Sequence, residues 1–362
     1  MIVTIIGAGN AGYAQACKLK ESGHTVRLLK TSHAIHEESF EEVRRKGGIY
    51  AIDTTNNDNT FFAELDMITR NVKEAILDAD VVMVVTQTLY HDAIAEKISD
   101  YIKENQIVIV IPGNAGSIFF KKNTYKKDII FSEGESMPYD ARIIESGKVR
   151  ISFRNVRNAL SFLPASKKDE GMKVASKLFD TYRYFRRHIF ESALHNPNIV
   201  VHIIGTILSA SRIEYSKGDF WMYREGFTDS IWNVVNDLDK EKNDILEALG
   251  CERLNYLDAC RFRNGEDLRV DSLEVFKYYA QKGGPKGPSS LNTRFLYEDI
   301  PMGLCLLSSL GKKCGIPTPI SDSLVNIASS LLKKNFWKEG RTLEKLGLDK
   351  MSKEEIINFV TV

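Results

Sequence analysis

The segment Ile2-Val3-Thr4-Ile5-Ile6-Gly7-Ala8-Gly9-Asn10-Ala11-Gly12 is the strongest indication of the fold of the N-terminal half of this chain. Its first five residues are all β-branched and four of them are apolar, as in a strand buried on both faces. The next six have the spacing GxGxxG, and a segment with helical periodicity follows them. A glycine-rich turn between a strand and a helix is typical of dinucleotide-binding domains.

Each glycine of this turn has a physical reason to be there. Gly7 permits the tight turn, Gly9 lets a pyrophosphate approach the backbone, and Gly12 lets the helix pack against the strand. The helix N-terminus then offers free N–H groups to the phosphates. The alternative is a glycine-rich turn without a ligand, and the combination of strand, motif and helix favours the dinucleotide over it. We therefore expect the cofactor to contact Gly7, Gly9, Asn10, Ala11 and Gly12.

Length and composition fit a globular protein of two domains. The chain has 362 residues, 43% of them hydrophobic and 27% charged. Its 49 lysines and arginines nearly cancel its 48 aspartates and glutamates, which argues against nucleic acid or an anionic membrane as partner. The five cysteines are scattered without metal-ligand spacing, so we expect reduced thiols and no metal site. They are Cys17, Cys251, Cys260, Cys305 and Cys314.

Targeting signals are not evident at the start of the chain. Met1 leads directly into the first apolar run, without a basic segment or a cleavage-like site. The longest apolar runs, such as Val81–Val85, are far too short to span a bilayer. We therefore expect a soluble, cytoplasmic protein.

Short apolar runs alternate with helical patterns over the first half of the chain. The strand-like runs are rich in valine and isoleucine, and between two of them Asp92–Tyr101 has helical spacing. This alternation predicts an α/β fold with a Rossmann-type, doubly wound parallel sheet. The predicted strands are Ile2–Ile6, Thr25–Leu29, Val81–Val85 and Ile107–Ile111, with Asp128–Phe131 and Ala159–Phe162 as extensions.

Helical patterns dominate from about Gly171 onward, so we predict an all-helical C-terminal domain. We place the boundary so that residues 1–188 bind the dinucleotide and residues 189–362 bind the substrate. Glycines and prolines exclude regular structure from Gln281–Ser290. The predicted helices are Met172–Phe185, Pro197–Ser216, Phe227–Leu249, Ser272–Ala280, Pro301–Leu310 and Ser321–Leu332.

The end of the second predicted strand bears on the choice of cofactor. An NAD site usually has a carboxylate there, which binds the ribose hydroxyls. This chain has Lys30-Thr31-Ser32 instead, and the first carboxylate after them is Glu37. A lysine and two hydroxyls favour the 2′-phosphate of NADP, although Lys30 could equally be a solvated lysine at a strand end. Thr86 and Pro112–Gly116 also follow strands, so they are candidates to contact the nicotinamide or its ribose, although each could equally be an ordinary turn.

A polar stripe runs along an otherwise apolar segment of the second half. At 100° per residue, the side chains on one side of this helix are His195, Asn198, His202, Thr206 and Ser209. A polar stripe on a buried helix costs desolvation unless something binds it, and a histidine there is a candidate proton donor. The alternative is a buried histidine that bonds a neighbouring helix. Asn198 is a candidate substrate-binding residue.

A second polar cluster follows the Gly/Pro-rich loop. Arg294 has the planar guanidinium that holds a substrate carboxylate, but its spacing to Glu298 also suits an i,i+4 ion pair. Asp299 could orient a histidine, or it could simply cap the helix predicted from Pro301. The residues themselves leave both alternatives open.

Four elements in chain order resemble the NAD/NADP octopine/nopaline dehydrogenase family, the opine dehydrogenases. The elements are GAGNAG at Gly7–Gly12, the PY…R within Met137–Arg142, NPNIVVH at Asn196–His202 and RFLYEDIPMGL at Arg294–Leu304. The resemblance spans both predicted domains. Its last two elements are specific, whereas GxGxxG is shared by many dehydrogenases.

The resemblance implies an NAD(P)H-dependent enzyme that joins an α-keto acid to an amino acid and reduces the resulting imine. It assigns His202 and Asp299 as the catalytic pair and Arg294 as the ligand of the keto-acid carboxylate. His202 is followed by Ile203-Ile204-Gly205 where better-studied members have a small, proline-containing sequence, which bears on substrate size. The loop Gln281–Ser290 is a candidate lid that excludes water. A homodimer is one option for the assembly.

Two other functions compete with this one. A ketopantoate or glycerol-3-phosphate type reductase has the same two-domain plan but relies on a catalytic lysine, and no lysine is as well placed as His202. A non-catalytic dinucleotide sensor would keep the first domain and use the second as a partner surface.

Overall fold

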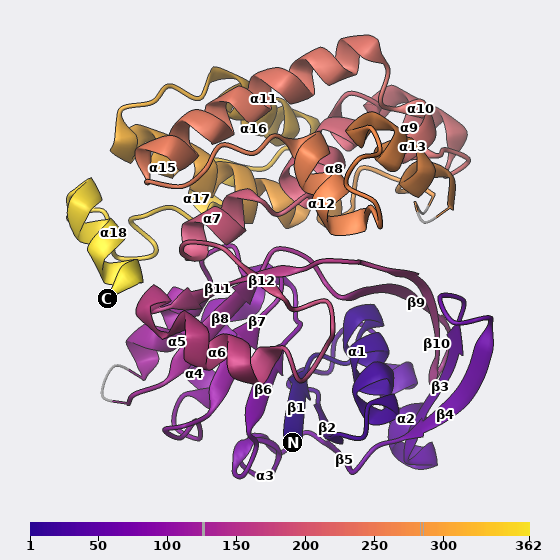
Figure 1. The fold of residues 1–362 in the computed structure, drawn as a ribbon. Helices are drawn as coiled ribbons and strands as arrows, with labels where there is room; N and C mark the ends of the chain where they lie inside the picture. Colours follow the sequence, from indigo (N-terminus) through magenta and orange to yellow (C-terminus); the bar gives the residue numbers. More distant parts are fainter. Residues whose placement is uncertain (125–126, 283, 285) are drawn as a thin grey trace. The chain divides into compact units, whose positions relative to one another are not determined.

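A computed structural model describes residues 1–124, 127–282, 284 and 286–362. The chain forms two compact units, one of residues 1–192 with Val362 and one of residues 193–361 (Figure 1). The division lies within α7 (Ile189–Leu194), whereas the boundary predicted from sequence follows residue 188. Residues 283 and 285 of the predicted lid, Gln281–Ser290, lie outside the described residues.

The first unit is built on an eight-stranded sheet of order β12-β11-β8-β7-β6-β1-β2-β5. All neighbouring strands pair in parallel except β8 and β11, which are antiparallel. The Rossmann-type fold predicted from sequence is confirmed, with a mixed rather than purely parallel sheet. The strands are β1 (Ile2–Ile6), β2 (Thr25–Leu29), β5 (Met67–Thr69), β6 (Val81–Val84), β7 (Ile107–Val110), β8 (Ile130–Gly134), β11 (Ala159–Leu163) and β12 (Tyr184–Phe185).

Burial explains why these runs form the central strands. Every residue of β6, β7, β8 and β11 is buried, as expected for strands covered on both faces. The helices that connect and cover them are α1 (Asn10–Glu21), α2 (Glu37–Lys46), α3 (Val72–Ile76), α4 (His91–Ile98), α5 (Ser117–Asn123) and α6 (Lys168–Ala175).

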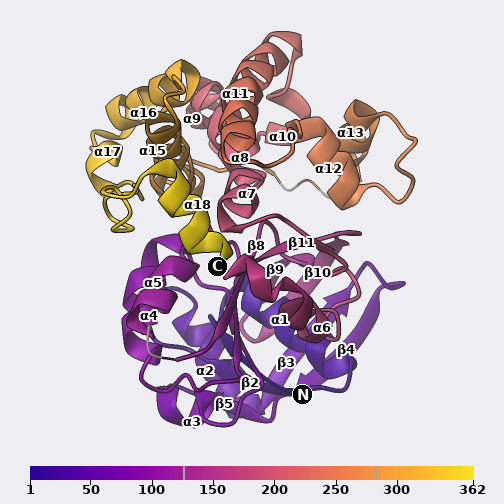
Figure 2. The ribbon, with the colours of Figure 1, turned by 60° about the vertical axis from the view of Figure 1, so that its left-hand side comes forward.

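A second sheet, of order β4-β3-β10-β9, was not predicted. Helix α1 packs against all four of its strands, as Figures 1 and 2 show. Its strands mix polar, half-buried and apolar residues, so no continuous apolar run marks them. They are β3 (Gly48–Asp53), β4 (Asn59–Glu64), β9 (Tyr139–Glu145) and β10 (Lys148–Arg154).

The described residues of the second unit form helices joined by loops and contain no strand, which confirms the predicted all-helical character. At its centre α8 (Asn198–Ile207) contacts α10, α11, α14, α16 and the π-helical turn η3 (Ile300–Leu304). The other helices are α9 (Ala210–Ser216), α10 (Met222–Glu225), α11 (Asp229–Ala248), α12 (Tyr256–Asn264), α13 (Ser272–Lys282), α14 (Arg294–Tyr297), α15 (Cys305–Cys314), α16 (Pro319–Leu332), α17 (Phe336–Glu339) and α18 (Lys353–Thr361).

Two predicted helices are wrong in extent. The segment predicted as a helix over Met172–Phe185 contains the end of α6 and the edge strand β12. The helix predicted over Pro197–Ser216 is two helices, because α8 ends at Ile207 and α9 begins at Ala210. Among the helices of the described ranges, none combines the length and the apolar character needed to cross a membrane.

Candidate active site

The phosphate loop has the shape that a pyrophosphate requires. Gly7 adopts φ 127°, a conformation that favours glycine, and a Cβ added at Gly12 would lie 1.7 Å from the Gly7 carbonyl oxygen. At Gly9 an added Cβ would meet nothing closer than the His36 ring, at 3.5 Å. Gly9 precedes α1, whose N-terminus has no side-chain cap and no acidic residue in its first turn. The loop therefore presents open backbone to an anionic ligand.

The sheet order places this loop where dinucleotides bind. Strand β1 lies between β2 and β6, so the sheet is extended on one side of β1 by β2 and on its other side by β6. In such sheets, ligands bind at the point where the strand order reverses, beyond the carboxyl ends of the strands. Thr86 follows β6, and its Oγ1 is buried without a hydrogen-bond partner in the described part of the chain. Asn10 Oδ1 accepts a hydrogen bond from Ile143 N at 2.8 Å. The group of Asn10 that would contact a ligand is therefore its backbone N–H. These features fit a bound dinucleotide.

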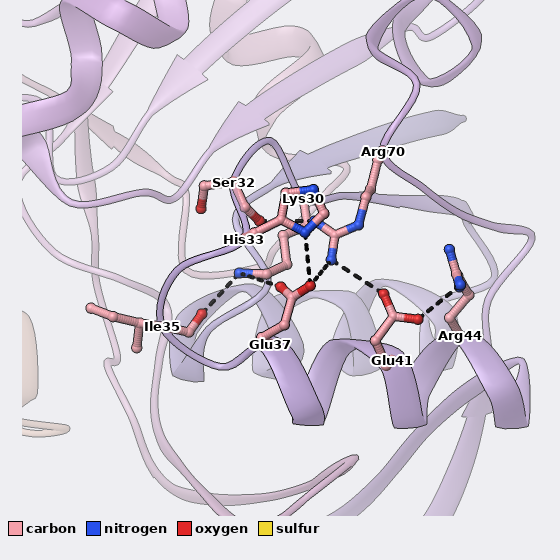
Figure 3. Close-up of polar contacts among 8 residues, drawn as sticks. All are labelled: Lys30, Ser32, His33, Ile35, Glu37, Glu41, Arg44 and Arg70. Atoms are coloured by element: carbon pink, nitrogen blue, oxygen red, sulfur yellow. Dashed lines mark hydrogen bonds and ion pairs between the residues drawn. The ribbon is translucent and has the colours of Figure 1, made fainter.

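The end of β2 carries a network of charges that the sequence did not predict (Figure 3). Lys30 is not a solvated lysine: its side chain is 7% exposed, and Nζ donates to the Ile35 carbonyl at 2.8 Å. Glu37 returns toward it, with Oε2 3.9 Å from the Lys30 ammonium. The neighbouring carbonyls also accept hydrogen bonds, that of Thr31 from Lys97 at 3.3 Å and that of Ser32 from Arg70 at 2.8 Å.

Arg70 was missed by the sequence analysis. Its Nη2 donates to Glu37 Oε1 at 2.5 Å and to Glu41 at 3.2 Å, and its guanidinium lies over the Phe40 ring. Arg70 directly follows β5, which pairs with β2, so the sheet brings it to the end of β2. Because β5 has only three residues, no strand was predicted there and the arginine gave no signal.

In the second unit, His202 and Asp299 form a buried pair although 97 positions separate them in sequence. His202 Nδ1 lies 2.7 Å from Asp299 Oδ2, and both side chains are less than one-tenth exposed. His202 comes from the middle of α8, and Asp299 directly precedes η3. Gly303 lets η3 approach α8, because a Cβ added there would lie 2.3 Å from Ile199 Cγ2. The pair is therefore positioned by packing of the helices.

The environment of Asp299 changes its proton affinity. Burial raises the pKa of Asp299 to about 7, while nearby Arg294 and a hydrogen bond from Asn198 act in the opposite direction. The carboxyl group therefore exchanges a proton near neutral pH. A buried carboxyl group with a strongly raised pKa is typical of functional sites.

The sequence left Asp299 as a helix cap or a partner of a histidine, and Arg294 as a carboxylate ligand or a partner of Glu298. Asp299 makes no side-chain cap at η3 and bonds the histidine instead. Arg294 forms the ion pair with Glu298, at 3.3 Å, yet 44% of its side chain is exposed. A guanidinium has five N–H donors, so an ion pair with one carboxylate leaves others that can bind a second one.

The polar stripe is only partly present. His195 is buried in the turn between α7 and α8, so it does not continue the face of α8. Thr206 Oγ1 donates to Met222 Sδ at 3.7 Å, and Ser209 lies beyond the end of α8. The side chain of Asn198, a predicted substrate ligand, hydrogen-bonds to Asp299.

Comparison with known proteins identifies both halves of the chain. Residues 185–332 match the family model for the NAD/NADP octopine/nopaline dehydrogenase, alpha-helical domain. Residues 2–113 match the NAD-dependent glycerol-3-phosphate dehydrogenase N-terminus. An opine dehydrogenase from Arthrobacter sp. (strain 1C) is 32% identical over 355 residues, which are 95% of this chain and 94% of the relative.

Solved structures agree in fold. Octopine dehydrogenase with NADH and L-arginine has a TM-score of 0.79 at 18% identity and covers 99% of this chain and 98% of its own. Yersinopine dehydrogenase with NADP⁺ has a TM-score of 0.73 at 13% identity, over 99% of this chain and 97% of its own. Because the match in sequence extends over nearly the full length of both chains, this protein belongs to the opine dehydrogenase family of NAD(P)-dependent oxidoreductases that act on CH–NH groups.

Proposed function

We propose that this protein reductively condenses an α-keto acid, such as pyruvate, with an amino acid to give a secondary amine dicarboxylate. The observation that carries the proposal is the buried hydrogen bond between His202 and Asp299. A histidine whose Nδ1 bonds a buried carboxylate is held in one orientation by it, which is the arrangement of a general acid/base.

The chemistry sets what these residues must do. Condensation joins amine nitrogen to keto carbon and releases water, and reduction then adds one hydride to that carbon and one proton to the nitrogen. The nicotinamide, when bound, supplies the hydride. His202 donates a proton to the departing hydroxyl and takes up the proton that the amine loses. Asp299 holds the imidazole through Nδ1 and, when ionised, stabilises its charged form.

Arg294 is the proposed ligand of the keto-acid carboxylate. Arg294 belongs to α14, as does Phe295, whose ring stacks on His202. Glu298 accepts from one guanidinium nitrogen and fixes its orientation. Structures of octopine dehydrogenase with pyruvate and with L-arginine support the substrate classes. We propose that Asn198 serves the site through Asp299.

For the cofactor we propose a preference for NADP over NAD. Family members bind either one, since octopine dehydrogenase was solved with NADH and yersinopine dehydrogenase with NADP⁺. Here Gly7–Gly12 and Thr86 would hold the dinucleotide, while Lys30, Thr31 and Ser32 lie at the end of β2. The buried ammonium of Lys30 favours a 2′-phosphate.

An NADPH-oxidation assay with pyruvate and pooled amino acids tests the proposal. Turnover that requires both substrates is expected. Turnover without the amine would instead indicate a simple keto-acid reductase, and absence of turnover with cofactor still bound would indicate a sensor.

Variant His202→Ala tests the central residue in the same assay. It should lower kcat by about 10²–10⁴-fold, while NADPH binding, followed by its fluorescence, is retained. Ile203→Val is the matched control on α8, because it trims one methyl from the adjacent buried residue and should keep kcat within about twofold. Normal turnover of His202→Ala would remove this histidine from the chemistry.

A further inference from the structure

The charges at the end of β2 form a compact group that we call the β2-end cluster: Lys30, His33, Glu37 and Arg70 (Figure 3). Three of the four are potential cations, and all three point toward the Glu37 carboxylate. Arg70 and His33 lie 2.5 and 3.0 Å from Oε1, and Lys30 lies 3.9 Å from Oε2. The cluster is thus an anion site whose present anion is a side chain.

We propose that Glu37 is an internal counterion that the 2′-phosphate of NADP displaces, with Arg70 and Lys30 as the phosphate ligands. The proposal rests on the NADP preference proposed above. Glu37 then lowers the affinity for NADP relative to NAD, because its carboxylate must leave before the 2′-phosphate binds.

The position of the cluster supports this role. His36, the residue before α2, adopts φ 63° and turns the chain back, and its ring lies 3.5 Å from the position of a Cβ on Gly9. The segment that carries Lys30 and Glu37 therefore adjoins the phosphate loop. In dinucleotide-binding domains the end of the second strand holds the adenosine ribose.

The contacts of Glu37 show a carboxylate that is held incompletely. Oε1 accepts two hydrogen bonds, whereas Oε2 is buried and accepts none from the residues described. A buried acceptor without a donor is costly. The side chain as a whole is 34% exposed and belongs to the first residue of α2, so it has a route to solvent.

The cations, by contrast, are fixed. The Lys30 side chain is 7% exposed and bonds the Ile35 carbonyl, and Arg70 bonds the Ser32 carbonyl and lies 4.7 Å over the Phe40 ring. If Glu37 swings out, these cations remain facing the vacated site, and Glu41, 3.2 Å from Arg70, is the one carboxylate drawn beside them in Figure 3 that stays. A phosphate carries more negative charge and more acceptor oxygens than a carboxylate, so it can satisfy them together.

Two ligands that differ only in the 2′-phosphate test the proposal: adenosine 2′,5′-bisphosphate and 5′-AMP. Their dissociation constants are measured by calorimetry on the full-length protein, without keto acid or amine. Glu37→Gln should tighten the bisphosphate on the order of tenfold and leave 5′-AMP unchanged, because it removes the competing charge. Arg70→Gln should weaken the bisphosphate by a similar factor and again spare 5′-AMP.

Glu38→Gln is the matched control, since it removes the same charge from the next residue of α2, where the side chain is exposed. Its ligand ratio should stay within about twofold of the original protein. Two results would overturn the proposal: a bisphosphate affinity that Glu37→Gln does not raise, or a loss of 5′-AMP and NADH binding in that variant, which would make Glu37 a ribose ligand. Neither result depends on opine synthesis, so failure of this proposal can be distinguished from failure of the proposed reaction.

Discussion

The imidazole of His202 lies flat against the phenyl ring of Phe295, with ring centroids 3.6 Å apart and planes 10° from parallel. The hydrogen bond to Asp299 fixes the same imidazole at Nδ1. Stack and hydrogen bond together fix both the plane of the ring and its rotation. The direction of Nε2 is therefore fixed as well.

This arrangement predicts that Phe295 positions the histidine without taking part in the reaction. Phe295→Leu should lower kcat by roughly tenfold, since a small misplacement of a catalytic group is costly. The KM of the keto acid should change little, and a pH–rate profile should keep its shape. Phe336→Leu is the control, as it removes another buried phenyl ring of this unit; it should lose similar stability and retain kcat. Equal losses of kcat in both variants would contradict a positioning role.

Asp299→Asn should change the dependence of stability on pH. Burial raises the pKa of Asp299 to about 7 from 3.8, so the folded protein holds this proton more tightly than the unfolded chain. The stability that it contributes is complete below about pH 4 and is lost as the pH rises through about 7. Asparagine cannot lose a proton, so the variant should be the more stable protein at pH 8, by on the order of 1–4 kcal/mol, with little difference at pH 4.

Calorimetric unfolding of the two proteins between pH 4 and pH 8 checks this sign. Asp53→Asn is a control of opposite sign: although burial opposes it, hydrogen bonds from Thr55 and Lys18 lower the pKa of Asp53. That variant should be less stable than the original protein at pH 8. A variant at position 299 that is destabilised equally at every pH would show that the buried charge of Asp299 is not costly.

The sequence predicted the fold where a local pattern matched the final environment. Runs such as Val81–Val84 are buried on both faces, so their apolar character alone identifies them as strands. The second sheet gave no such signal, because β3 and β10 acquire their parallel pairing across some 100 residues of chain. Long-range pairing of half-polar strands is not encoded in a short window.

The same contrast holds for the site. The resemblance to a family assigned His202, Asp299 and Arg294, but the residues alone left Asp299 as a cap or an orienter. Its contact with His202 follows from the approach of η3 to α8, which depends on tertiary packing. At the end of β2, the sequence shows only that Glu37 is the first carboxylate after Lys30, Thr31 and Ser32. The left-handed turn at His36 brings it back to Lys30.

Arg294→Lys should act on substrate binding. Lysine keeps the charge but loses the planar fork that binds a carboxylate through two parallel hydrogen bonds. The KM of the keto acid should rise about 10- to 100-fold, while the KM of the amino acid and the affinity for NADPH should change far less. Steady-state kinetics with each substrate varied in turn measure the three effects. A rise confined to the amino acid would reassign Arg294 to the other substrate.

Substitutions in the phosphate loop should separate folding from cofactor binding. Gly12→Ala would place a methyl 1.7 Å from the Gly7 carbonyl, so α1 must shift from β1 and the unfolding temperature should fall by several degrees. Gly9 has φ −114°, and a Cβ added to it would lie 3.5 Å from the nearest atom, in the His36 ring. The Gly9→Ala variant should therefore fold normally. Its methyl would nevertheless fill the space in which the pyrophosphate approaches the backbone, and NADPH affinity should fall at least tenfold. Thermal unfolding and fluorescence titration of both variants decide the matter. If Gly9→Ala bound NADPH with unchanged affinity, the pyrophosphate could not lie against this glycine.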